Sequence, residues 1–208
     1  LDLPAHGQSQ VQLPGPSVRA LAGFVAKFLQ QIDVPQVHAV GHSLGGAIAT
    51  QLALDAPDKV VSLSLIASAG LGAEINTGYT DGFVKAESRR ELKPVLEQLF
   101  ANRELVSRQM IDDVLKYKRL DGVGETLAAL ASAVFSGGRQ SEQPGLQLAK
   151  ADKPVLVIWG QQDQVIPAGH AANAPAGAKV QVFDDAGHMV QMERANDVNR
   201  LLIRHLIG

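Results

Sequence analysis

A short glycine-rich segment in the first quarter of the chain constrains the fold more than any other feature. Gly41-His42-Ser43-Leu44-Gly45-Gly46 follows an apolar run typical of a buried strand and precedes one typical of a buried helix. In that context its G-x-S-x-G pattern indicates a sharp strand-to-helix turn that lifts the serine hydroxyl clear of a sheet. We expect glycine at positions 41 and 45 because a side chain at either would clash with the neighbouring strand or helix.

Further apolar segments predict strands that alternate with helices. The expected strands are 36–40, 60–66, 154–159 and 178–183. Apolar residues at helical spacing predict helices over 18–32, with Ser17 as N-cap, over 47–54, and at the end of the chain. This alternation is typical of a mostly parallel, doubly wound α/β sheet.

A long insertion separates the second and third expected strands. It is far longer than an ordinary crossover and has helical patterns at 83–87, 89–101, 104–118 and 123–135. We interpret 71–150 as a helical cap inserted between two parts of an α/β core, 1–70 and 151–208. Acidic and basic residues balance in the insertion, so we interpret the basic run 116–119 as a solvated helix face.

Composition excludes several classes of protein. Hydrophobic residues make up 46% of the 208 residues, which supports a substantial core, and 19 basic residues oppose 21 acidic ones. Proteins that bind nucleic acid or an anionic membrane normally have an excess of basic residues, and this chain has none. The absence of cysteine excludes thiol chemistry. The longest uncharged stretch, 34–54, contains too many polar residues and glycines for a membrane span.

The first residues do not form a signal peptide. Leu1-Asp2-Leu3-Pro4 has neither a basic nor an apolar leader segment and is typical of a strand entering a loop. We therefore interpret the chain as an N-terminally truncated piece of a longer, cytoplasmic protein.

Two residues at strand ends complete a candidate catalytic triad with Ser43. A serine needs a base held in one tautomer to become a good nucleophile. Asp163 follows the third expected strand and His188 follows the fourth, at the sheet edge where parallel sheets assemble their sites. We predict Ser43 as nucleophile, His188 as base, Asp163 as its orienting acid and the Leu44 N–H as an oxyanion donor.

Other polar residues receive structural interpretations. Asp184 and Asp185 adjoin His188 in sequence and are expected to shape its loop, while His42 is expected to form a wall or a hydrogen bond. His6 is expected to anchor the opening loop. The remaining histidines are interpreted as packing or surface residues: His38, His170 and His205. No pair of histidines has metal-ligand spacing with a carboxylate partner, so no metal is expected.

The chain resembles the α/β-hydrolase family over nearly its whole length. Asp2 to Ser9 is similar to that family's D-L-P-G-H-G-x-S loop, with Ala5 in place of the usual glycine. The order Ser, Asp, His is also that of the family. The segments 62–76, 115–120 and 188–193 resemble more narrowly the hydrolase-like domain of the dihydrolipoamide acetyltransferase component of bacterial acetoin dehydrogenase complexes.

This resemblance implies partners and parts that lie outside the chain. It implies a parent with an N-terminal lipoyl domain, coenzyme A as co-substrate, and contact with other subunits of a multienzyme dehydrogenase complex. No cofactor is expected to bind the chain itself. It also implies that the first strands of the fold are missing, with a second oxyanion donor, whose loss costs about 100- to 1,000-fold in rate. The strand 36–40 then becomes an exposed apolar edge, and we expect a weakly active chain that self-associates.

The predicted function is serine-dependent transfer of a small acyl group through an acyl-enzyme, by resemblance the acetyltransferase reaction with dihydrolipoamide and coenzyme A. One alternative is a cofactor-free hydrolase of esters, lactones or carbon–carbon bonds. Another is a non-catalytic binding or scaffolding domain.

Overall fold

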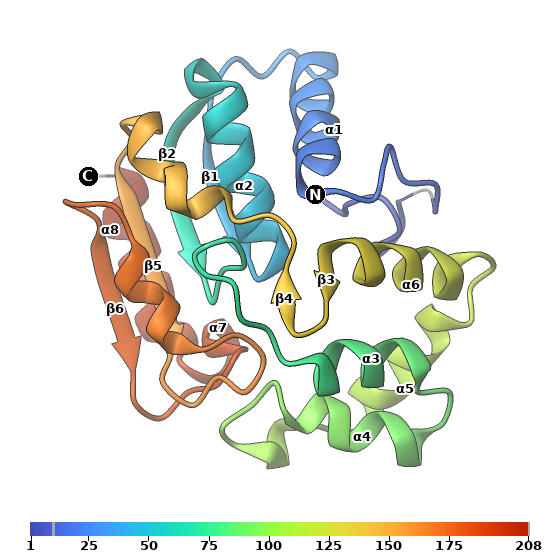
Figure 1. Ribbon diagram of the computed structural model, residues 1–208. Coiled ribbons are helices and arrows are strands. Elements are labelled where there is room, and N and C mark those ends of the chain that lie inside the picture. The colour runs from blue at the N-terminus through green and yellow to red at the C-terminus, as the bar shows by residue number, and fades with distance from the viewer. Residues whose placement is uncertain (10, 208) are drawn as a thin grey trace.

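A parallel four-stranded sheet forms the centre of the computed structural model, which describes residues 1–9 and 11–207 (Figure 1). Its strands are β1 (Val37–His42), β2 (Val60–Ile66), β5 (Val155–Gly160) and β6 (Lys179–Phe183), in that spatial order. All three pairings are parallel. This confirms the expected α/β-hydrolase type of sheet.

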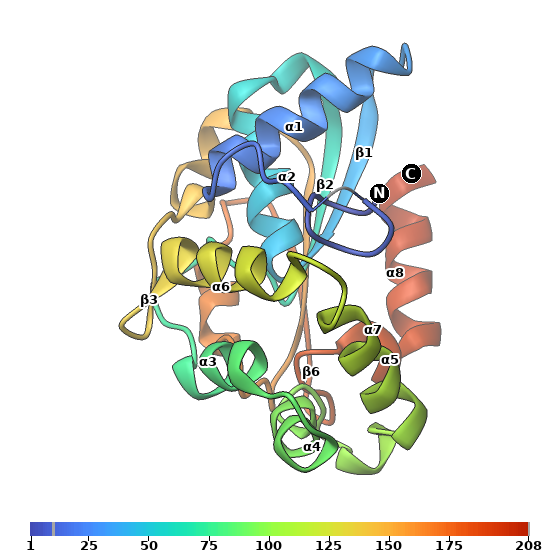
Figure 2. The ribbon, with the colours of Figure 1, turned by 90° about the vertical axis from the view of Figure 1, so that its right-hand side faces the viewer.

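Helices cover both faces of the sheet (Figure 2). On one face lie α1 (Val18–Gln31) and α2 (Leu44–Asp55), and on the other α8 (Ala195–Ile207), preceded by the short α7 (Val190–Glu193). Every residue of β5 is buried, and its side chains alternate between the two cores: Val157 packs toward α1 and α2, and Ile158 toward α8. Such continuous apolar runs are typical of strands covered on both faces.

Four helices occupy the insertion between β2 and β5: α3 (Thr77–Lys85), α4 (Arg89–Glu97), α5 (Arg108–Lys118) and α6 (Val123–Val134). They lie beyond the carboxyl ends of the strands (Figure 1). The segment from α3 to α5 has a small core of its own, which includes Leu92, Phe100 and Ile111, whereas α6 packs Leu130 and Val134 into the central core. A hairpin of β3 (Phe135–Ser136) and β4 (Arg139–Gln140), then a 3-10 segment (Pro144–Ala151), lead back to β5. The boundaries 70/71 and 150/151 of a separate cap domain stay a prediction.

Capping residues explain where the observed helices depart from the expected ones. The first insertion helix begins at Thr77, not at 83, because the Asn76 side chain accepts the Gly78 N–H at 2.8 Å. Ser107 caps α5 in the same way, so this helix begins at Arg108 and not at 104. Ser17 caps α1 as predicted, with Ala20 N as donor at 3.0 Å.

The basic run 116–119 is only partly the solvated face that the sequence predicted. The Lys118 ammonium donates to the Val84 and Ala86 carbonyls, at 3.2 and 2.6 Å, and to the Phe83 carbonyl. It therefore closes the C-terminal end of α3, and burial lowers its pKa. The Tyr117 hydroxyl donates to the Ala5 carbonyl and ties α5 to the opening loop.

Strand β1 lies at one edge of the sheet, with β2 as its neighbour. Val40 on this strand is 48% exposed. An apolar pocket beside it lies between the strand, α1 and α2, and is lined among others by Val25, Phe28 and Ile48. An exposed apolar edge is thus present in this structure, while self-association stays a prediction. Among the described residues, no helix is long and apolar enough to cross a bilayer.

Candidate active site

Ser43 stands in a strained turn between β1 and α2. Its φ is +54° and its ψ −123°, a region that a side chain disfavours, at a cost on the order of 1–3 kcal/mol. The turn is held from the end of β2: the Ser43 N–H donates to the Ile66 carbonyl at 3.0 Å, and the Ala69 N–H to the Ser43 carbonyl at 2.9 Å. The Ser43 side chain forms no capping hydrogen bond to α2.

The glycines around Ser43 are needed at positions 41 and 46 rather than 41 and 45. A Cβ on Gly41 would lie 2.3 Å from the Gly45 carbonyl oxygen, and one on Gly46 would lie 2.1 Å from the Ser68 hydroxyl. A Cβ on Gly45 would meet nothing within 4 Å. The expected clash at position 45 is therefore wrong: the turn after β2 crowds α2 at Gly46, while Gly45 faces the open pocket beside β1.

The structure brings Asp163 and His188 together. Asp163 follows β5 and His188 follows β6, and His188 Nδ1 lies 2.8 Å from Asp163 Oδ2. Their side chains are 0% and 2% exposed. Asp163 Oδ1 also accepts the N–H groups of Val165 and Ile166, at 2.8 and 2.9 Å. A carboxylate fixed in this way holds the proton on Nδ1 and leaves Nε2 available as a base.

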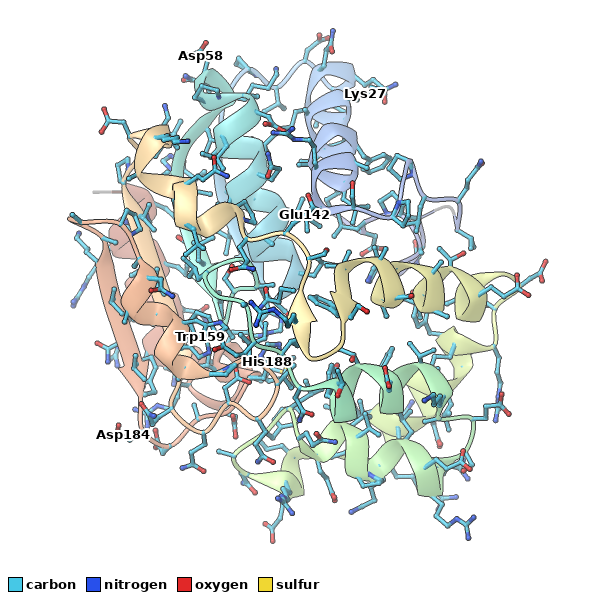
Figure 3. The ribbon with its side chains drawn as sticks, in the orientation of Figure 1. Lys27, Asp58, Glu142, Trp159, Asp184 and His188 are labelled. Carbon is cyan, nitrogen blue, oxygen red and sulfur yellow. The ribbon has the colours of Figure 1, made fainter. Side chains whose placement is uncertain are left out.

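Trp159 provides a further contact that the sequence analysis missed. Its indole Nε1 donates to Asp163 Oδ2 at 2.9 Å, and Figure 3 shows it near His188 where the sheet meets the insertion. The ring is fully buried at the end of β5. A single tryptophan in an apolar strand is typical of core packing, so no local signal distinguished this role.

His42 packs directly against His188. The ring centroids lie 4.7 Å apart, and His42 Nε2 donates to the His188 carbonyl at 3.0 Å. Burial, and then the neighbouring His188, lower the pKa of His42 to about 4. His42 is therefore neutral at pH 7 and carries its proton on Nε2, which confirms the expected hydrogen-bonding role.

Contacts from two sides hold the loop that carries His188. Asp185 pairs with Arg194 at 2.6 Å and so shapes the loop as expected, whereas Asp184 contributes its backbone carbonyl, which accepts from Gln162 at 2.9 Å. Glu193, a second residue that the sequence analysis missed, accepts the Gly187 N–H at 2.6 Å.

Tyr79 on α3 brings a polar group of the insertion toward the site. Its ring contacts the central core and the insertion core. Burial, and then the charge of Asp163, raise the pKa of Tyr79 to about 12, so the phenol stays neutral. The sequence analysis did not identify it.

The remaining histidines make local or packing contacts. His6 Nδ1 lies 3.0 Å from the Pro4 carbonyl within the opening loop, as expected. The others contact neighbouring elements: His38 the Ser62 hydroxyl, His170 the Glu74 carboxylate and His205 the Leu63 carbonyl. In the part of the chain that the structure describes, no three potential metal ligands cluster.

An oxyanion donor is available beside Ser43. Leu44 is the first residue of α2, so its N–H has no acceptor within the helix.

Within the described residues no hydrogen bond joins the Ser43 hydroxyl to the His188 ring. Such contacts often become short only when substrate is bound.

A sequence profile described as "alpha/beta hydrolase fold" matches residues 1–195. The chain belongs to the α/β-hydrolase family. The matched residues include the elbow at Ser43, then Asp163 and then His188, in the chain order of that family.

Two curated α/β-hydrolase relatives have the name dihydrolipoyllysine-residue acetyltransferase component of acetoin cleaving system. The one from Cupriavidus necator is 60% identical over 208 residues, and the one from Pseudomonas putida is 48% identical over 206. The chain spans 56% and 55% of the length of these relatives. The narrower resemblance that the sequence predicted is thereby confirmed.

More distant relatives are hydrolases. A 2-hydroxy-6-oxononadienedioate/2-hydroxy-6-oxononatrienedioate hydrolase from Cupriavidus pinatubonensis is 27% identical over 215 residues, with 99% of this chain and 74% of the relative covered. The solved meta-cleavage product hydrolase from Pseudomonas fluorescens IP01 superposes with a TM-score of 0.86 at 21% identity, over 98% of this chain and 77% of that one. At that identity the likeness concerns the fold alone.

Proposed function

We propose that this α/β-hydrolase chain transfers a small acyl group through an ester on Ser43. The observation that carries the proposal is the buried Asp163–His188 pair, 2.8 Å apart, packed against His42, the residue before a serine held at a positive φ. A buried acid–histidine pair next to a strained nucleophile is the arrangement that serine catalysis requires.

The proposed reaction has two halves. His188 Nε2 takes the proton of the Ser43 hydroxyl while the oxygen attacks a thioester carbonyl, and Asp163 stabilises the imidazolium. The Leu44 N–H donates to the oxyanion, and the thiol leaves with the proton from His188. A second thiol, or water, then gives a proton to His188 and attacks the ester carbonyl. His188 returns that proton to the Ser43 oxygen as the ester bond breaks, so that the acyl group leaves on the acceptor.

Similarity to the two acetoin-cleaving relatives supports the choice of substrates. By that similarity the acyl group is acetyl, the donor and acceptor thiols are dihydrolipoamide and coenzyme A, and the partners are subunits of a cytoplasmic multienzyme complex. The lipoyl group would be carried on a domain outside this chain. The whole protein's activity is part of this proposal, because the chain spans about half of these relatives.

A hydrolase is the second candidate, and the hydrolase relative at 27% identity supports it. In that case water is the acceptor in the second half of the reaction. Release of acetyl from an acetyl thioester distinguishes the two: coenzyme A accelerates the release for a transferase and leaves it unchanged for a hydrolase.

The first test is intact mass after exposure to a serine-directed fluorophosphonate, for the chain and its Ser43→Ala variant. We expect one adduct, absent in the variant. If the chain and a longer version that includes preceding strands both remain unlabelled, the catalytic proposal fails and a binding or scaffolding role is favoured.

A further inference from the structure

One carboxylate joins the loop of His188 to the helical insertion. Glu193 Oε2 accepts the N–H of Gly187, the residue before His188, at 2.6 Å. Glu193 Oε1 accepts the N–H of Asn102, which lies between α4 and α5, at 2.9 Å. Both oxygens of one side chain are therefore used, one on each segment, and hydrogen bonds to a charged acceptor are the stronger kind.

The two segments are also in direct contact. The Met189 N–H donates to the Leu99 carbonyl at 2.9 Å, and the Met189 side chain packs against the core of the insertion. A Cβ on Gly187 would lie 2.8 Å from the Ala101 nitrogen and 2.9 Å from the Leu99 carbonyl oxygen. The backbone on both sides of His188 therefore lies against residues 99–102.

His42 bounds the same loop from the elbow side. It donates to the His188 carbonyl at 3.0 Å and packs against the His188 ring. His188 is thus held between His42 on the elbow side and, on the insertion side, the direct contact of Met189 with Leu99 and the bridge through Glu193.

We propose that Glu193 is a positioning residue that couples the placement of the helical insertion to the placement of His188. The inference rests on the proposed function, since it assigns His188 as the base. Glu193 touches no reacting atom. Its effect is exerted through the Gly187 and Asn102 backbone, and a misplacement of about 1 Å at a reacting group can cost on the order of 100-fold in rate.

The matched pair of variants is Glu193→Gln and Glu142→Gln. Glu142 likewise uses both carboxylate oxygens on backbone N–H groups, those of Val18 at 2.6 Å and Arg19 at 3.3 Å, and Figure 3 shows it apart from His188. Each substitution leaves one acceptor oxygen and turns an amide NH₂ toward the other N–H donor. The loss of hydrogen bonding is therefore comparable, and only the location differs.

Two readouts separate positioning from stability. The first is the second-order rate of fluorophosphonate labelling, measured well below the thermal midpoint of each variant. The second is the side-chain ¹H–¹⁵N NMR signal of His188, which reports its Nδ1 contact with Asp163 without any reaction. We expect Glu193→Gln to lower the labelling rate roughly 10- to 100-fold and to shift the His188 signal, and Glu142→Gln to change neither.

A change at the other end of the link checks the route. Asn102→Pro removes the N–H that Glu193 Oε1 accepts, and Asn102→Ala removes only the side chain, which caps the turn at Glu104. We expect the proline variant, and not the alanine variant, to reproduce the Glu193→Gln shift, and the double variant to add little to it.

Unchanged His188 signals in Glu193→Gln and Asn102→Pro would overturn the inference. Failure of the proposed function has a different signature. In that case wild type remains unlabelled, while the NMR comparison still decides whether Glu193 positions His188.

Discussion

The indole Nε1 of Trp159 lies 2.9 Å from Asp163 Oδ2, the same oxygen that accepts from His188. The acid of the candidate triad is therefore fixed by its own strand as well as by the loop that follows. Trp159 also donates to the Ile166 carbonyl at 3.3 Å, so its ring links β5 to the turn that carries Asp163.

Replacement of this tryptophan tests the link. We expect Trp159→Phe to reduce the free energy of unfolding by about 2–4 kcal/mol, since it removes a buried donor and leaves a cavity. Denaturant unfolding followed by circular dichroism measures the change. A loss under about 0.5 kcal/mol, the range of an ordinary surface substitution, would contradict the assigned contacts.

The two adjacent glycines of the elbow should respond in opposite directions. Gly46→Ala places a methyl group on the Ser68 hydroxyl, and we expect a loss of about 1–3 kcal/mol of stability together with slower labelling of Ser43. Gly45→Ala faces open space within α2, and we expect a gain of roughly 0.5–1 kcal/mol from helix propensity. Equal effects in thermal unfolding would count against this reading of the elbow.

Ala5 is held at a φ of +62° although it is not glycine. The left-handed conformation costs a residue with a Cβ about 1–2 kcal/mol, and glycine avoids this cost. Glycine also makes the unfolded chain more flexible, which offsets part of the gain in stability. We expect Ala5→Gly to stabilise the protein by up to about 1 kcal/mol. Ala26→Gly, within α1, is the control and should destabilise by about 1 kcal/mol.

The lowered pKa of His42 makes stability depend on pH. Between pH 6.5 and about 4 the unfolded chain binds a proton at this position that the folded chain does not. The contribution is therefore complete above pH 6.5 and is lost as the pH falls toward 4, with a slope on the order of 1 kcal/mol per pH unit. As the pH is lowered from 8 to 4, urea midpoints should fall more steeply for wild type than for His42→Gln, and identical slopes would disprove the assignment.

The edge strand β1 predicts concentration-dependent association. Val40 is 48% exposed in a strand whose outer edge carries no charge, and unprotected edges of this kind pair with other chains. We expect sedimentation velocity to show oligomers that Val40→Lys reduces. Ile203→Lys places the same charge on an exposed apolar residue of α8 and should leave the distribution unchanged. A monomer at all concentrations would contradict the prediction.

Local patterns predicted the elements that local forces define. Strand 60–66 is rich in valine, leucine and isoleucine, interrupted only by two serines, and follows Pro57; it was predicted with its observed bounds. The positions of Asp163 and His188 followed from the strand ends, because parallel strands bring their carboxyl ends to one edge. By contrast α3 contains Gly78 and Gly82, which weaken its periodicity, so its first turns were missed.

Contacts between distant segments could not be predicted in this way. Glu193 and Asn102 are 91 residues apart, and nothing in the sequence around either marks the pair. The crowding at Gly46 comes from Ser68, which follows β2. Ser68 lies against α2 because β2 pairs with β1, the strand that leads into α2. For the same reason the motif alone misplaced the second required glycine.

The conformation of Ser43 has an evolutionary consequence. Its backbone suits glycine better than serine, and its side chain contributes no cap to the helix that it begins. Selection for folding alone would thus replace this residue, and the protein without the proposed nucleophile would be the more stable one. Under the proposed function, stability and activity compete at this single position, so a lineage that no longer used the hydroxyl would be expected to lose the serine early.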